Sequence, residues 1–322
     1  MAPPFHYQLG SARLSSDIAL GGLSHAGSGD EAAITIRRGR PGGADLEWGP
    51  HPDGAEFVPD WVRVDHLRSA DGAWYRIRYD YRGHFADIAI RSDGREITVD
   101  AGEGETDAEL SNLIEGPILG RAMRLAGYPS LHATALSFEG RAIALMGASG
   151  VGKSSLAWAL VQQGCRLVSD DMVGLAMADG RPVVHPGRAR LRIWPDVVEG
   201  LGVDASISTA LFPTTLEMTK VGVRDPALFS HGPVPLHAVY HVRPRHSAAV
   251  EARIEDLPAS ERLAELAANL HGVIAPDRQA RKRELALLAQ IAAVTPLRAV
   301  TLPHDLEALS RVAAALRPRL FG

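Results

Sequence analysis

The stretch "RAIALMGASGVGKSSLAWALVQQ", residues 141–163, decides the fold of the larger part of this 322-residue chain. An apolar run leads into a loop with the spacing Gly-x-x-x-x-Gly-Lys-Ser, and apolar residues then recur at helical intervals. A strand, a glycine-rich turn and a helix in this order are typical of a P-loop, in which backbone N–H groups and the helix N-terminus surround a polyphosphate. The sequence therefore predicts a nucleotide-binding P-loop.

Each position of this loop has an expected part in holding a nucleotide. The glycines allow backbone N–H groups to turn inward, Lys153 can reach the β- and γ-phosphates of ATP, and Ser154 can bind Mg²⁺. A chance glycine-rich turn with a surface lysine is the alternative, which the flanking strand and helix patterns disfavour. The predicted nucleotide-binding residues are Gly147, Ala148, Ser149, Gly150, Val151, Gly152, Lys153, Ser154 and Ser155.

Two carboxylates follow the loop closely. Asp170 and Asp171 come 17 and 18 residues after Lys153, which leaves room for one helix, a turn and one strand. Adjacent residues on an extended strand point to opposite faces, so one carboxylate can address Mg²⁺ while the other addresses an incoming hydroxyl. This division suits a kinase, in which a base accepts the hydroxyl proton. The alternative is that one or both aspartates cap a turn.

Histidine and arginine side chains flank the predicted site. His132 precedes the P-loop lysine by 21 residues, on a strand expected to pair with the one that enters the loop. Its imidazole could orient an aspartate or tune the aspartate's pKa, and a hydrogen-bonded core histidine is the alternative. Arg188, Arg190 and Arg192 alternate, so an extended chain would turn all three toward a phosphate or an acidic substrate. A solvated basic strand edge is the alternative there, and Lys220 is a weaker candidate contact.

The rest of the chain suggests two domains. β-forming residues, often in alternation, recur in the first 105 residues, in the segments 32–38, 74–81, 85–92 and 95–100. Thr106 and Glu109 then have the spacing of a capping box, which predicts the start of a helix. We therefore expect a smaller β-rich domain over 1–105, suited to peptide recognition, and a P-loop domain over 106–322. Residues 37–57 are rich in Gly and Pro and predict a surface loop.

Composition limits the class of protein and its partners. The chain is 46% hydrophobic and 22% charged, as expected for a globular protein. A net charge of -4 and a pI near 6.4 provide no global attraction to nucleic acid or to an anionic membrane. No stretch approaches 18 uninterrupted apolar residues, and the N-terminus lacks a signal-peptide pattern, so we expect a cytoplasmic protein. The single cysteine, Cys165, excludes an intramolecular disulfide and a cysteine-based zinc site.

The stretch "LHATALSFEGRAIALMGASGVGKSSLAWALVQQGCRLVSDD", residues 131–171, resembles the catalytic core of HPr kinase/phosphorylase. It has a histidine on the strand before the P-loop, and "LVSDD" stands where that family carries an aspartate pair. The resemblance implies an α/β fold of the HPr kinase and phosphoenolpyruvate carboxykinase group, with a mixed sheet and C-terminal helices. It also implies ATP and Mg²⁺ as cofactors.

The same resemblance implies a role for each site residue. Asp170 would be the base that accepts a serine hydroxyl proton, and His132 would be its supporting partner. Asp171 and Ser154 would lie on the Mg²⁺ side, and Lys153 would lie on the phosphates. Relatives of the HPr enzyme form closed rings, so a homo-oligomer is expected as well.

Departures from the family bear on the acceptor. Ser155 stands where HPr enzymes usually carry Glu, and "PGRARLRIWPD", residues 186–196, replaces their Glu-Ile-Arg-Gly-Leu-Gly segment. This stretch is similar to one in the HPr kinase-like proteins of lasso peptide biosynthesis, which implies a precursor peptide with a C-terminal serine as the acceptor. The alternatives are a small protein such as HPr, free serine, or no acceptor at all in a nucleotide-dependent regulatory module.

Overall fold

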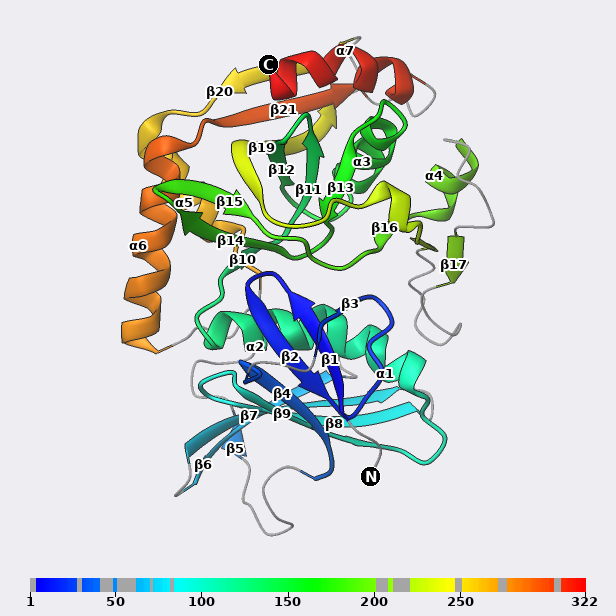
Figure 1. The fold of residues 1–322 in the computed structure, drawn as a ribbon, viewed down its shortest axis with the longest axis vertical. Helices are drawn as coiled ribbons and strands as arrows, with labels where there is room; N and C mark the ends of the chain where they lie inside the picture. The colour runs from blue at the N-terminus through cyan, green and yellow to red at the C-terminus, as the bar shows by residue number, and fades with distance from the viewer. Residues whose placement is uncertain are drawn as a thin grey trace. The chain divides into compact units, whose positions relative to one another are not determined.

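The computed structural model describes residues 4–27, 31–40, 49–50, 62–69, 72–81, 84–200, 208–210, 221–246, 251–271, 277–303 and 308–322. The chain divides into two compact units, which Figure 1 shows as ribbons. Unit 1 consists of Met1–Tyr128, Phe212–Glu217 and Gly272–Arg281. Unit 2 consists of Pro129–Leu211, Met218–His271 and Lys282–Gly322.

Unit 1 is built on a nine-stranded sheet with the order β3-β1-β2-β4-β9-β8-β7-β6-β5. Its strands are β1 (Phe5–Leu9), β2 (Ala12–Ser16), β3 (Ser24–His25), β4 (Ile34–Arg38), β5 (Gly49–Pro50), β6 (Val62–Ser69), β7 (Gly72–Tyr81), β8 (His84–Arg91) and β9 (Glu96–Ala101). The four predicted β segments are confirmed as β4, β7, β8 and β9. Most of the predicted surface loop, 41–48 and 51–57, lies outside the described residues.

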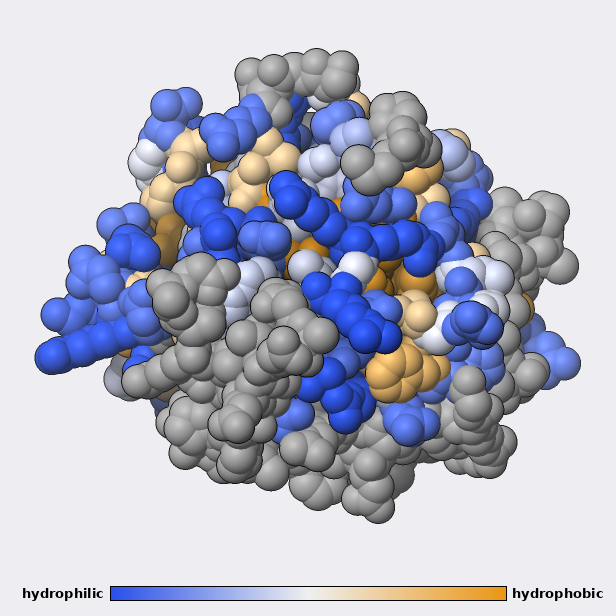
Figure 2. Space-filling model, turned by 90° about the horizontal axis from the view of Figure 1, so that it is seen from below, coloured by the Kyte–Doolittle hydropathy of each residue, from blue (hydrophilic) through white to orange (hydrophobic). Residues whose placement is uncertain are grey.

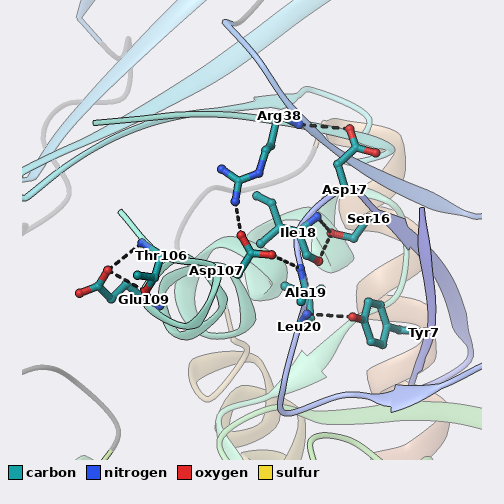
Figure 3. Close-up of polar contacts among 10 residues, drawn as sticks. All are labelled: Tyr7, Ser16, Asp17, Ile18, Ala19, Leu20, Arg38, Thr106, Asp107 and Glu109. Carbon is teal, nitrogen blue, oxygen red and sulfur yellow. Dashed lines mark hydrogen bonds and ion pairs between the residues drawn. The ribbon is translucent and has the colours of Figure 1, made fainter. Parts of the chain in front are cut away.

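Helices of unit 1 follow the sheet in sequence: α1 (Asp107–Leu113), the π-helix η1 (Ile114–Ile118) and α2 (Leu119–Leu125). The predicted capping box is confirmed, because the Thr106 side chain accepts from the Glu109 N–H and the Glu109 carboxylate accepts from the Thr106 N–H. Figure 3 shows this box beside Asp107, which accepts from the Ala19 N–H at 3.0 Å and pairs with Arg38.

The boundary between the units differs from the predicted one. It lies after Tyr128 rather than at residue 105, because the first helix is fastened to the β-rich part. The Gly21 N–H donates to Ser111 on α1 at 3.0 Å, and the Gly22 N–H donates to the buried Glu115 carboxylate at 2.7 Å. These bonds satisfy backbone groups of the loop after β2, so the helix belongs to unit 1.

Unit 2 contains a mixed sheet with the order β10-β14-β15-β19-β12-β11-β13, extended by β21 next to β19 and by β20 next to β21. Its strands are β10 (Ser130–Leu131), β11 (Ala133–Phe138), β12 (Arg141–Met146), β13 (Arg166–Ser169), β14 (Val173–Ala178), β15 (Arg181–Val184), β19 (Val234–His246), β20 (Arg253–Asp256) and β21 (Leu297–Pro303). β19 pairs in parallel with β12 and β21, whereas the other pairs are antiparallel. The predicted mixed sheet is thus confirmed, although its long strand β19 was not predicted.

Helices cover both faces of this sheet. They are α3 (Lys153–Val161), α4 (Pro195–Gly200), α5 (Ala259–Ala268), α6 (Arg278–Val294) and α7 (Leu309–Phe321). A small separate sheet has the strand order β16 (Leu191–Ile193), β18 (Val221–Val223), β17 (Ser208–Ala210). Alternate residues of β12 face opposite layers: Ile143 packs in the cluster with α3 and α7, and Ala144 packs in the cluster with α5 and α6. A strand buried on both faces must be apolar throughout, which explains the run "AIALM".

The surface of the described residues is mainly polar. Figure 2 shows one face on which the coloured residues are mostly hydrophilic, with small hydrophobic patches between them. The large hydrophobic side chains that are exposed in the described part are Phe5, Trp194, Leu285 and Val294. Among the described helices, none has the length and the apolar character needed to cross a membrane.

Candidate active site

Strand register brings the predicted site residues together at one end of three neighbouring strands of the sheet in unit 2. β11 lies between β12 and β13 and is antiparallel to both, with Ala133 opposite Met146 and Ala135 opposite Ser169. The P-loop follows Met146, the aspartate pair follows Ser169, and β11 begins directly after His132. The end of β12, the end of β13 and the start of β11 therefore meet, as the sequence predicts.

The P-loop backbone adopts conformations that glycine allows. Gly147, Gly150 and Gly152 have φ angles of 136°, 84° and 105°. A Cβ atom added to Gly147 would lie 2.5 Å from the carbonyl oxygen of Val242 on β19, so the loop leaves no room for a side chain there. The buried Lys153 donates through Nζ to the carbonyl oxygen of Gly147 at 2.7 Å. The lysine side chain thus joins the end of the P-loop to its first residue.

Helix α3 begins without a side-chain cap. Its N-cap is Gly152, and no side chain there accepts from the first turn. The first N–H groups of a helix have no intrahelical partner and carry partial positive charge, so an open N-terminus is suited to an anion such as a phosphate. Ser154 is half-buried in this first turn and Ser155 is buried. The geometry fits the phosphates of a nucleotide.

Asp170 is buried and both of its carboxylate oxygens are occupied. Thr134 on β11 donates through its hydroxyl to Oδ1 at 2.7 Å, and the backbone N–H of Arg192 on β16 donates to Oδ2 at 2.8 Å. The family resemblance paired His132 with Asp170, but the structure places His132 against Asp171. Asp170 therefore fastens β11 to the segment before α4 in this conformation.

Asp171 is the aspartate that faces the other candidate side chains. Its φ angle is 68°, a left-handed conformation that Asp tolerates better than most residues. His132 Nδ1 lies 3.1 Å from Asp171 Oδ1, and Arg188 Nη2 and Arg192 Nη1 lie 2.8 and 3.4 Å from Oδ2. β13 ends at Ser169, so the two aspartates lie in a turn and the alternation expected of an extended strand does not apply.

The charge state of Asp171 follows from these contacts. Burial alone would raise the pKa of its carboxyl group. The hydrogen bond with His132 and the positive charges of Arg188, His271 and Arg192 outweigh burial, and they hold the pKa of Asp171 well below its ordinary value. The group is therefore ionised throughout the neutral pH range.

The three predicted arginines do not form one solvated face. Arg188 and Arg190 are buried, with 2% and 3% of their surfaces exposed, so the interpretation as a solvated strand edge is wrong for both. Arg188 and Arg192 share Asp171 as a partner, and β16 covers only Leu191–Ile193 of this segment. The other candidate, Lys220, lies outside the described residues.

His271 is a site residue that was not predicted from the sequence. The isolated bridge between Leu131 and Leu270 and the hydrogen bond from the His271 N–H to the Ser130 carbonyl oxygen bring it to the site. Its ring centroid lies 5.9 Å from that of His132. Nothing in the sequence near His271 pointed to the site, because the segment that it pairs with is about 140 residues earlier in the chain.

A second imidazole–carboxylate pair lies beside the P-loop and was also missed. His241 on β19 stands opposite Met146 in the parallel pairing with β12. Its Nδ1 lies 2.8 Å from Oε2 of Glu265 on α5, and its ring carbon Cδ2 would be 3.4 Å from a Cβ atom at Gly147. The pair therefore supports the start of the loop from the neighbouring strand.

Comparisons with known proteins point to one family. Residues 123–203 match the family model described as the HPr Serine kinase C-terminal domain. The HPr kinase/phosphorylase of Lactobacillus acidophilus is 40% identical over 80 residues, which are 25% of this chain and 24% of that protein. The HPr kinase/phosphorylase of Lactobacillus delbrueckii subsp. bulgaricus is 44% identical over 82 residues, 26% of each chain.

The solved HPr(Ser) kinase/phosphatase from Coxiella burnetii aligns with 60% of this chain and 99% of its own, at 15% identity and a TM-score of 0.28. The sequence matches span about a quarter of the length of the curated relatives. The match to the family model, over residues 123–203, includes the P-loop, the aspartate pair and the arginine segment. The segment 123–203, which holds most of this site, is therefore related to the HPr serine kinase C-terminal domain.

Proposed function

We propose that this chain is an ATP-dependent kinase that transfers the γ-phosphoryl group to a serine hydroxyl. One observation carries the proposal. The uncapped start of α3 and the His132–Asp171 pair lie at the same end of the neighbouring strands β11, β12 and β13. Phosphoryl transfer needs a site that holds the donor phosphates and a carboxylate that orients the acceptor. The names of the curated relatives support the same reaction class.

The loop and α3 would bind the nucleotide. Lys153 Nζ, which lies on the carbonyl oxygens of Gly147 and Ala148 at 2.7 and 2.9 Å, would turn to the β- and γ-phosphates when these enter. The N–H groups of the first turn of α3 would face the same phosphates. Such fixed donors stabilise the charge of the transition state without having to reorganise.

The acceptor hydroxyl would meet the aspartates. Asp171 is our candidate for the base, because its carboxylate faces His132 and its side chain is 20% exposed, whereas Asp170 is only 3% exposed. Its low pKa makes Asp171 a weak base, which a loose phosphoryl-transfer transition state tolerates. The resemblance assigns this role to Asp170, which could take it by releasing Thr134.

Magnesium fits only part of its predicted site. Mg²⁺ would screen the phosphoryl oxygens when it is bound, and the hydroxyl of Ser154 in the first turn of α3 is a suitable oxygen ligand. Asp171, the other predicted ligand, fits Mg²⁺ poorly in this arrangement, because two guanidinium groups contact its Oδ2 and its Oδ1 faces a histidine nitrogen, whereas Mg²⁺ prefers oxygen ligands. We therefore assign Ser154 alone to this ion.

The direct test is phosphoryl transfer from labelled ATP to defined acceptors. The acceptors are an HPr-type small protein, a lasso precursor peptide that ends in serine, and free serine. Asp171→Asn should reduce transfer more than Asp170→Asn, with nucleotide binding retained in both. If Asp170→Asn is the more damaging variant while its thermal unfolding is unchanged, the base is Asp170.

The choice of acceptor is a finer part of the proposal. The relatives' names favour a small protein, and the segment 186–196 favours a precursor peptide. The arginines give no separate support to a peptide carboxylate, because Arg188 and Arg192 are already paired with Asp171. Nucleotide binding without transfer to any acceptor would instead support a regulatory module. A cytoplasmic location and a homo-oligomer remain predictions.

A further inference from the structure

Three metal-binding side chains come from three adjacent segments of unit 2. His132 and His271 each follow one residue of the antiparallel bridge between Leu131 and Leu270. Two backbone hydrogen bonds of 2.7 Å hold this bridge. The His132 N–H donates to the Asn269 carbonyl oxygen, and the His271 N–H donates to the Ser130 carbonyl oxygen. Residues on either side of an antiparallel bridge share one face, so both imidazoles lie on the same side.

Asp171 is brought to this face from the opposite side of β10. β10 pairs with β14, and Leu131 stands opposite Val173, two residues after Asp171. The left-handed conformation of Asp171 then turns its carboxylate toward His132. A non-glycine residue in this region is held there by its surroundings, and such conformations concentrate at functional sites.

The donor atoms are close enough to share one ion. One ligand atom each from His132, Asp171 and His271 lies within 4.8 Å of the others. Rotations of the side chains could bring such atoms to the Zn–N and Zn–O distances of about 2.0–2.2 Å. Two imidazoles and one carboxylate suit Zn²⁺ and similar transition ions, whereas Mg²⁺ prefers oxygen ligands.

The arginines leave one carboxylate oxygen for such an ion. Arg188 and Arg192 contact Oδ2 of Asp171, and His132 contacts Oδ1. An ion on the Oδ1 side would still be repelled by the two guanidinium groups.

A second group of donors, in unit 1, is less suitable. His84, Glu105 and Glu109 also place one ligand atom each within 4.8 Å of the others. The Glu109 carboxylate, however, accepts two hydrogen bonds from Thr106, and Glu105 accepts from the Phe85 N–H at 3.2 Å. An ion there would compete with the capping box of α1, so the group in unit 2 is favoured.

We propose that His132, Asp171 and His271 bind a divalent transition metal ion of the Zn²⁺ class, and that this ion inhibits the kinase. The inhibitory part rests on the proposed function. An ion on Asp171 and His132 occupies the carboxylate that would accept the hydroxyl proton, so bound metal and transfer exclude each other. The site lies outside the phosphate-binding loop, so nucleotide binding should persist in the presence of the ion.

The test combines metal binding and activity. Calorimetric titration of the full chain with Zn²⁺ should show one ion per chain, and His271→Ala should weaken binding by at least about tenfold. Co²⁺ should give a visible absorption spectrum in the wild type that His271→Ala removes. Transfer from ATP by the wild type should fall as the site fills with Zn²⁺, whereas transfer by His271→Ala, relative to that variant's own rate without metal, should not fall over the same Zn²⁺ range.

Control variants make the outcome decisive. His237→Ala removes a half-buried histidine of β19 that is in neither group, and it should leave Zn²⁺ binding unchanged. His271→Gln provides a second loss of the imidazole if the alanine variant is unstable. Absence of Zn²⁺ binding by the wild type, or loss of binding in His84→Ala instead of the His271 variants, would overturn the site. Zn²⁺ binding without inhibition of an active kinase would overturn the inhibitory role alone.

Discussion

Two helices of this protein begin in opposite ways. Helix α1 in unit 1 is closed by Thr106 and Glu109, whose side chains satisfy backbone N–H groups at its start. Helix α3 in unit 2 starts at Gly152, with a φ angle of 105° and no side-chain cap. A capped N-terminus is complete without a ligand, whereas an open one is completed by an anion. Helices α5 and α7 also begin without a side-chain cap, so the left-handed Gly152 and the glycine-rich loop before it, and not the missing cap alone, set α3 apart.

The open end of α3 has an energetic cost that packing offsets. With Gly152 at the N-cap, the missing side-chain cap costs roughly a few tenths of a kcal/mol of helix stability. Leu156, Ala157 and Leu160 of α3 are fully buried in the cluster that also contains α7 residues. Burial of one leucine side chain contributes roughly 1.5–3 kcal/mol, so tertiary packing can hold α3 in place without a cap.

The largest effect should come from Lys153→Ala. Removal of one donor that meets the transition-state charge reduces turnover by roughly 100- to 1,000-fold, and we expect at least that loss in kcat/KM for phosphoryl transfer. Thr106→Ala is the matched control at the capped helix and should leave kcat/KM unchanged. Equal transfer by wild type and Lys153→Ala would show that α3 does not hold the donor phosphates.

A smaller effect is expected from adding a methyl group to the P-loop where it packs against β19. Gly147→Ala places a methyl group 2.5 Å from the Val242 carbonyl oxygen at a φ angle of 136°, and should destabilise the protein by about 3 kcal/mol or more. Gly150→Ala meets no atom within 4 Å and should cost only about 1–2 kcal/mol through its positive φ. Urea unfolding followed by Trp fluorescence measures both, and equal costs would contradict the close contact with β19.

The capped helix should respond more weakly. Thr106→Ala removes the side chain that accepts from the Glu109 N–H and should cost about 1 kcal/mol. Amide hydrogen exchange of residues 107–113 should accelerate about fivefold, because this free energy corresponds to that factor in local opening. Binding of ATP should not change. Unaltered exchange in α1 would mean that packing, and not the cap, holds its first turn.

The smallest effect concerns pH. Hydrogen bonds from the backbone N–H and side chain of Thr106 lower the pKa of Glu109 below its ordinary value of 4.5. A carboxyl group with a lowered pKa in the folded state stabilises the fold above its unfolded pKa, and this contribution is lost as pH falls through the folded pKa. Protection of the α1 amides should therefore decrease below about pH 4.5. Glu109→Gln should show a flatter profile, and identical profiles would exclude Glu109 as the source.

The sequence by itself determined the elements that depend on near neighbours. The strand, glycine turn and helix of the P-loop lie within 23 residues, and the capping box spans four. The hairpin of β11 and β12 is fixed by alternating apolar residues and the turn at Glu139-Gly140, where both φ angles are positive. In each case the residues that interact are close in the chain, so their spacing alone indicates the structure.

Only the tertiary structure decided which side chains meet at the site. β19 enters between β15 and β12, and its pairing depends on contacts with residues about 90 positions earlier. His271 reaches His132 through a single bridge, and the left-handed turn at Asp171 selects which aspartate faces them. Long-range pairing and a one-residue change of backbone conformation leave no periodic pattern in a sequence, because they are set by burial and hydrogen bonding in the folded chain.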